Sequence, residues 1–176
     1  MSLAMVPRGE SVNQEFDELF REHFQFVYRT AFTVTGSRQD AEDVLQTIFL
    51  RLIRREIPPT LKQNAKGYLY RAAINESLNV IRARKRHDFT DDLDAFESVT
   101  ARTAEASDEL QRSLVEAMAQ LNPLAVEILI LRYEHDYSDA QIAKLLGKSR
   151  GTVAVTLFRT RARLKSLLRA ALGDKL

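Results

Sequence analysis

The sequence predicts an all-α protein of two small helical domains joined by an acidic flexible linker, the second domain containing a helix-turn-helix. Apolar residues recur at helical spacing through most of the chain, and no stretch alternates as a strand would. Residues 88–107 break this pattern, because they are rich in Asp, Glu, Ser, Thr and Ala and have little apolar periodicity. We therefore expect an N-terminal domain over residues 12–87, the linker over 88–107 and a C-terminal domain over 108–172.

Composition restricts the kind of protein further. With 176 residues, of which 45% are hydrophobic, the chain can build one ordinary domain or two small ones. The net charge is only +2, so affinity for nucleic acid has to come from where the charges lie. The absence of cysteine excludes disulfides, thiolate metal sites and cysteine nucleophiles. No apolar run reaches membrane-spanning length and the N-terminus lacks a signal-peptide core, so we expect a soluble cytoplasmic protein without membrane insertion.

The second predicted helix, from Ser37 to about residue 55, has two different faces. One face is apolar and includes Val44, Ile48 and Phe49; the opposite face is polar except for Leu50. An exposed leucine among acids and amides indicates a protein partner, although single exposed leucines are common. The prolines that follow predict a loop over residues 56–66.

The third predicted helix, residues 67–86, carries a row of arginines and amides. The row consists of Arg71, Asn75, Asn79, Arg82 and Arg86 and contains no glutamate. Arginine and asparagine are side chains that hydrogen-bond phosphates and base edges. The row therefore favours a nucleic-acid surface over an ordinary solvated face.

Residues 138–168 have the pattern of a helix-turn-helix. Ser138 and Gln141 form a capping box, Gly147 ends the first helix, and Ser149 caps a longer second helix. Val153 and Leu157 face inward, which leaves a basic outer face. This predicts a DNA-binding motif; the alternative is a helical hairpin with a solvated basic face.

Several segments resemble one known family. Residues 40–52, Asp-Ala-Glu-Asp-Val-Leu-Gln-Thr-Ile-Phe-Leu-Arg-Leu, resemble the polymerase-binding helix of bacterial sigma-70 family sigma factors of the extracytoplasmic-function group. Residues 68–75 are similar to the next helix of that family. Residues 121–133 and 138–153 are similar to its second domain.

The resemblance implies a promoter-specificity subunit, without catalytic residues, metal or cofactor, whose partners are core RNA polymerase, promoter DNA and an anti-sigma factor. It also implies that one copy acts on each polymerase. The residues implied to bind polymerase are Asp40, Asp43, Gln46, Thr47, Phe49 and Leu50. Those implied to bind the −10 promoter element are Lys66, Tyr68, Arg71, Asn75, Asn79, Arg82 and Arg86. Those implied to bind the −35 element are Lys148, Ser149, Arg150, Thr152, Val155, Thr156, Arg159 and Arg163.

The chain departs from the family pattern at three places. Thr47 stands where an acid is usual, and Tyr68 replaces a tryptophan. Ala154, Val155 and Thr156 replace a frequent Lys-Ser-Arg, so we expect weak phosphate binding by this helix.

Two other classes of function are weighed against this one. A stand-alone helix-turn-helix regulator would have no reason to carry Asp43 and Gln46 beside the arginine and asparagine row. An enzyme is suggested by the His87-Asp88 doublet, which resembles metal-dependent phosphohydrolases, but His23 and His135 lack ligand spacing.

Overall fold

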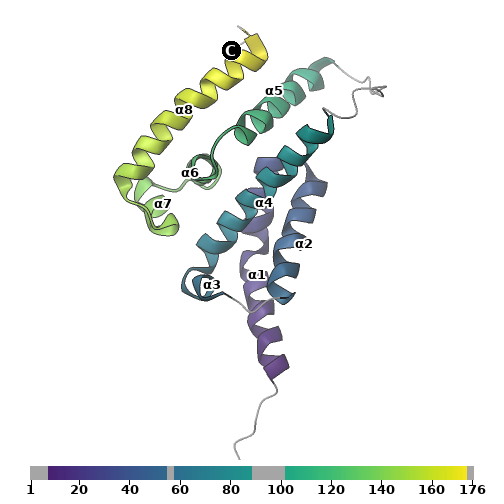
Figure 1. Ribbon diagram of the computed structural model, residues 1–176, viewed down its shortest axis with the longest axis vertical. Helices are drawn as coiled ribbons and strands as arrows, with labels where there is room; N and C mark the ends of the chain where they lie inside the picture. Colours follow the sequence, from purple (N-terminus) through teal and green to yellow (C-terminus); the bar gives the residue numbers. More distant parts are fainter. Residues whose placement is uncertain (1–7, 55–57, 89–101, 174–176) are drawn as a thin grey trace, which may run out of the picture.

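The computed structural model of the chain describes residues 8–54, 58–88 and 102–173, and these residues form eight helices and no strand (Figure 1). The predicted all-α class is therefore confirmed for this part of the chain. The helices are α1 Arg8–Thr35, α2 Arg38–Arg54, α3 Pro59–Gln63, α4 Ala65–Asp88, α5 Arg102–Ala119, α6 Pro123–Tyr133, α7 Asp139–Leu146 and α8 Arg150–Leu172. We call α1 to α4 the N-terminal unit and α5 to α8 the C-terminal unit.

The N-terminal unit packs α1, α2 and α4 side by side (Figure 1). Gly36 ends α1 with a φ of 67°, a conformation that glycine adopts without a steric penalty. Ser37 then caps α2, because its hydroxyl accepts the Asp40 N–H at 3.3 Å. Val27, Val44 and Leu69, one from each long helix, meet in the core of this unit.

Two predicted boundaries are wrong. The predicted loop over residues 56–66 contains the short helix α3, because Pro59 suits the first helical turn and Leu61 is buried. Helix α5 begins at Arg102, inside the predicted linker of residues 88–107, where alanine and glutamate favour helix over coil. Residues 89–101 of that linker lie outside the described residues.

The C-terminal unit contains the predicted helix-turn-helix in α7 and α8. The Ser138 side chain accepts the Gln141 N–H, and the Gln141 side chain accepts the Ser138 N–H, so the predicted capping box is confirmed. Gly147 has a φ of 65° at the turn, and the Ser149 hydroxyl accepts the Thr152 N–H at 3.0 Å to start α8. These local signals set the direction of α8.

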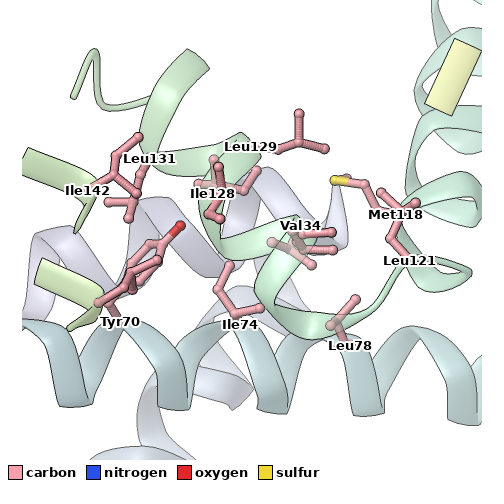
Figure 2. Packing of buried hydrophobic residues seen from close by; sticks show 14 of the residues in the cluster. Val34, Tyr70, Ile74, Leu78, Met118, Leu121, Ile128, Leu129, Leu131 and Ile142 are labelled. Carbon is pink, nitrogen blue, oxygen red and sulfur yellow. The ribbon is translucent and has the colours of Figure 1, made fainter. Parts of the chain in front are cut away.

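The two units share one buried core. Figure 2 shows Tyr70 and Ile74 of α4 pointing toward Leu131 and Ile128 of α6, and Leu78 lying further along the same helix, on the side of Leu121. Helix α4 thus has two apolar sides, one packed on α1 and α2 and the other on the C-terminal unit. Helical periodicity in the sequence predicts one buried side for this helix, with Leu69, Tyr70, Ile74 and Leu78 on it, but the structure divides them between two sides.

Candidate nucleic-acid and protein interfaces

The exposed face of α2 combines polar and apolar side chains. Asp43 and Gln46 are exposed, and Thr47 is half-buried. Leu50 is 46% exposed and Ile53 is 59% exposed. Ile53 was not among the predicted site residues, although its position one turn beyond Leu50 could have indicated it.

Two residues of the predicted polymerase-binding set are buried. Asp40 forms an ion pair with Arg84 of α4 at the start of α2. Phe49 makes edge contacts with Phe16 and Phe20 of α1, with ring centroids 6.0 and 4.8 Å apart. In this conformation Asp40 and Phe49 hold α2 against its neighbours and do not form part of its outer surface.

Most of the predicted row on α4 lies along the surface of the molecule. Asn75 and Asn79 are exposed, whereas Tyr68 and Arg71 are half-buried. Glu76 points instead to α2, where its carboxylate accepts hydrogen bonds from Arg51 at 2.8 and 3.2 Å. The outer row therefore contains no carboxylate that would repel a phosphate.

Lys66 and Arg82, both of the predicted −10 set, are bound to the C-terminal unit. Lys66 donates a hydrogen bond to the Tyr137 hydroxyl. Arg82 donates through Nε and Nη2 to the carbonyl oxygens of Ala119 and Leu121, each at 3.2 Å. In this structure both cationic side chains are therefore hydrogen-bonded to the C-terminal unit.

A second contact between the units lies where α4 meets α7. Asn64 Oδ1 accepts the Gly67 N–H at 2.9 Å, and its Nδ2 donates to the Leu145 carbonyl oxygen at 2.9 Å. A Cβ atom on Gly67 would lie 2.7 Å from that same carbonyl oxygen. This close approach requires a glycine.

His135 lies in the middle of the interface between the units. Its ring is 4.6 Å from that of Phe26, centroid to centroid, and its Nε2 is 3.2 Å from the Thr30 hydroxyl. Beside it, Arg29 pairs with Glu134 at 3.0 Å. Burial lowers the pKa of His135, so the ring is neutral in this interface at neutral pH.

Glu127 is a buried carboxyl on α6. Burial raises its pKa to about 6, and the positive charges of Arg71 and Lys148 oppose that rise. The backbone carbonyl of Glu127 accepts a hydrogen bond from the Tyr70 hydroxyl at 2.6 Å. Residues from both predicted DNA-binding surfaces therefore influence one acid at the junction of the units.

The predicted −35 residues lie on α8 between Arg150 and Arg163 and at the two positions before it. Lys148, Arg150, Arg159 and Arg163 are exposed, as are Ser149, Thr152 and Val155. Thr156 differs from these residues because it is half-buried, at the edge of the side of α8 that packs on the protein. Phe158, which was not predicted as a site residue, is 75% exposed on this helix.

The described residues offer neither a metal site nor a membrane-spanning helix. In residues 8–54, 58–88 and 102–173, no group of three His, Cys, Asp or Glu side chains is arranged to hold a metal ion. No helix within these same ranges is long and apolar enough to cross a membrane.

Comparison with known proteins links both units to one family. Residues 19–87 match the family described as Sigma-70 region 2, and residues 111–164 match the one described as Sigma-70, region 4. The chain is 32% identical over 155 residues to the ECF RNA polymerase sigma factor SigM of Mycobacterium tuberculosis, covering 87% of this chain and 76% of that protein. It is 32% identical over 154 residues to the RNA polymerase sigma-E factor of Streptomyces antibioticus, covering 88% and 84%.

A solved structure has a similar fold. It is the sigma factor RpoE in complex with the anti-sigma factor NepR from Bartonella quintana, with a TM-score of 0.52 and 22% identity. The match covers 92% of this chain and 99% of that one. At this identity the likeness concerns the fold alone.

Proposed function

Because the chain belongs to the sigma-70 family of RNA polymerase sigma factors, in its extracytoplasmic-function group, we propose that it is a promoter-specificity subunit. It binds core RNA polymerase in the cytoplasm and directs transcription initiation at −10 and −35 promoter elements, without catalytic activity of its own. The observation that carries this proposal is that both sigma regions match in order along one chain.

Core polymerase binds the exposed face of α2. Asp43 and Gln46 supply polar contacts there, and Leu50 and Ile53 supply apolar area beside them. A protein interface commonly places apolar anchors in its centre and polar groups around them. Asp40 and Phe49 are buried, so they hold α2 in position and do not contact the polymerase.

The two DNA elements are read by different helices. The exposed amides Asn75 and Asn79 on α4 hydrogen-bond base edges of the −10 element, where strand opening exposes them. Flipping a base out of the stack costs a few kcal/mol, which contacts in a protein pocket offset. Helix α8 enters the major groove at the −35 element.

In this structure the two units pack against each other, and we call this the closed arrangement. It has to open when the chain binds a promoter. The −10 and −35 elements are roughly 25 base pairs apart, which at 3.4 Å per pair is about 85 Å. In the closed arrangement, by contrast, the two units are in direct contact and share one buried core. The contacts of Lys66 and Arg82 with the C-terminal unit must therefore break before both elements are bound.

An anti-sigma factor fits this arrangement as a further partner. The RpoE structure that shares this fold contains one. A protein that binds both units of this chain at once would favour their closed arrangement over the open one, because it adds contacts only to the closed state. Such a partner would reduce the fraction of chain that is free to bind core polymerase.

The experiment that tests the function is a binding measurement with purified core RNA polymerase and no DNA. We expect a stoichiometric complex that elutes as one species in size-exclusion chromatography. A stand-alone regulator would instead leave the core polymerase unbound and bind operator DNA by itself. That second outcome would contradict the proposed function.

A further inference from the structure

Phe158 is unusually exposed for its residue type. No other large apolar side chain in the described residues is as accessible as Phe158, at 75%, and Val155 one turn earlier is 50% exposed. Both lie on α8, the helix assigned to the −35 element. A phenylalanine in water at this position has no role in the core of the protein.

The two side chains project from the middle of the outer face of α8. Val153 and Leu157, which are 0% and 6% exposed, define the buried side of the helix. At about 100° per residue, Val155 and Phe158 lie roughly 60° apart on the opposite side. Exposed Gly151 and Ala162 lie on the same side, and they are too small to cover Val155 and Phe158.

Cations surround this apolar pair. Arg150, Arg159 and Arg163 are exposed on the same helix, and Lys148 is exposed just before it. Helix α8 contains no aspartate or glutamate. Arg161, by contrast, is held by the Tyr133 hydroxyl and ring, away from the groove side. An apolar centre with cationic edges complements a DNA groove, whose walls are phosphates.

We propose that Phe158 and Val155 read the C5-methyl groups of thymines in the −35 element by apolar contact. This inference rests on the proposed function. In the major groove only thymine among the four bases presents a methyl group, and apolar side chains recognise it by contact. The side chains of Ala154 and Val155 have no hydrogen-bonding atoms, so these side chains select the base edges that face them by shape and not by hydrogen bonds.

The test removes methyl groups from the DNA. Full-length chain is assembled with core polymerase, and a promoter that it uses is selected from genomic DNA. Each thymine of the −35 element, on either strand, is then replaced by uracil, which differs only by the methyl group. We expect binding of the holoenzyme to weaken about fourfold at one or two positions, the effect of losing one buried methyl group.

Protein variants assign the effect to the side chain. Phe158→Ala should bind thymine and uracil promoters equally at the affected position, and its stability should be unchanged because the ring is exposed. The matched control is Leu110→Ala, which removes a 44% exposed apolar side chain from α5. The control should keep the full preference for thymine.

Each of the following results would overturn the inference. One is a selected −35 element without thymine on either strand, and another is equal binding of wild-type holoenzyme to every uracil substitution. The third is a Phe158→Ala variant that keeps the preference for thymine, or that loses affinity for core polymerase without DNA, which would identify a protein contact. If the holoenzyme initiates at specific promoters but binds thymine and uracil promoters equally, only this inference is refuted. If it initiates at no specific promoter, the proposed function is refuted.

Discussion

The contact between Asn64 and Leu145 permits a selective perturbation of the closed arrangement. The amide of Asn64 has two separate tasks, since Oδ1 caps α4 and Nδ2 donates to the C-terminal unit. The substitution Asn64→Asp keeps the capping oxygen, because aspartate is an equally good cap. It replaces the donor by a carboxylate oxygen that faces the Leu145 carbonyl oxygen.

The expected magnitude follows from the loss of one donor. Leaving a buried acceptor without its partner costs about 1–3 kcal/mol, and this contact is only partly buried. We therefore expect the equilibrium constant for closing to fall about tenfold, which corresponds to about 1.4 kcal/mol. Apparent affinity for core polymerase should rise by the same factor as long as the closed form predominates.

The assay is energy transfer between dyes on the two units. The chain contains no cysteine, so cysteines introduced at exposed Glu42 and Ala170 label without side reactions. We expect Asn64→Asp to lower the transfer efficiency and to increase core affinity. The matched control is Asn122→Asp, which makes the same substitution at the cap of α6, where the Asn122 side-chain oxygen accepts the Ala125 N–H at 2.8 Å.

A transfer efficiency of Asn64→Asp equal to that of the wild-type chain would refute this reasoning. It would mean that the contact between Asn64 and Leu145 does not hold the units together in solution. A lower efficiency in Asn122→Asp as well would show that the opening is caused by a new carboxylate charge at a helix cap and not by the lost contact with Leu145.

Three further predictions concern single side chains. Asp43→Ala and Gln46→Ala should leave the melting temperature unchanged and weaken core polymerase binding by about 1–3 kcal/mol each, measured by fluorescence titration. Asn75→Ala should impair promoter opening and relax base preference at one −10 position, measured by permanganate reactivity on a substituted promoter series. The pKa of Glu127 is raised to about 6 from 4.5, so the folded chain holds this proton more tightly than the unfolded chain. Its contribution to stability is present below pH 4.5 and is lost as pH rises through 6. Glu127→Gln should remove about 2 kcal/mol of this pH dependence in urea unfolding.

Each of these predictions has a contrary outcome. Unaltered core affinity in both α2 variants would remove Asp43 and Gln46 from the interface. Unchanged base preference in Asn75→Ala would move −10 recognition to residues 56–66. An unfolding free energy of Glu127→Gln that follows the same pH curve as wild type would show that this carboxyl titrates normally.

Features with local causes could be predicted from the sequence. The capping box of Ser138 and Gln141 and the turn at Gly147 depend on neighbouring residues only, and both are confirmed. The inward positions of Val153 and Leu157 follow from helical periodicity, and both are buried. The helix-turn-helix could therefore be placed without a structure.

Features that depend on contacts between distant segments could not be predicted. Helical periodicity placed Arg82 in an outward row, but its guanidinium is bound to carbonyl groups at the end of α5. Tyr70 and Leu69 were expected on one buried side, yet they face different neighbours. The 75% exposure of Phe158 could not be predicted either, because an apolar aromatic side chain is usually buried.

The most direct test of the central claim is run-off transcription with core RNA polymerase and a pool of genomic promoter fragments. We expect discrete transcripts only when the chain is present, and their promoters should share one −10 and one −35 sequence. Transcripts that are unchanged by the chain, with core polymerase known to be active, would contradict its assignment as a promoter-specificity subunit.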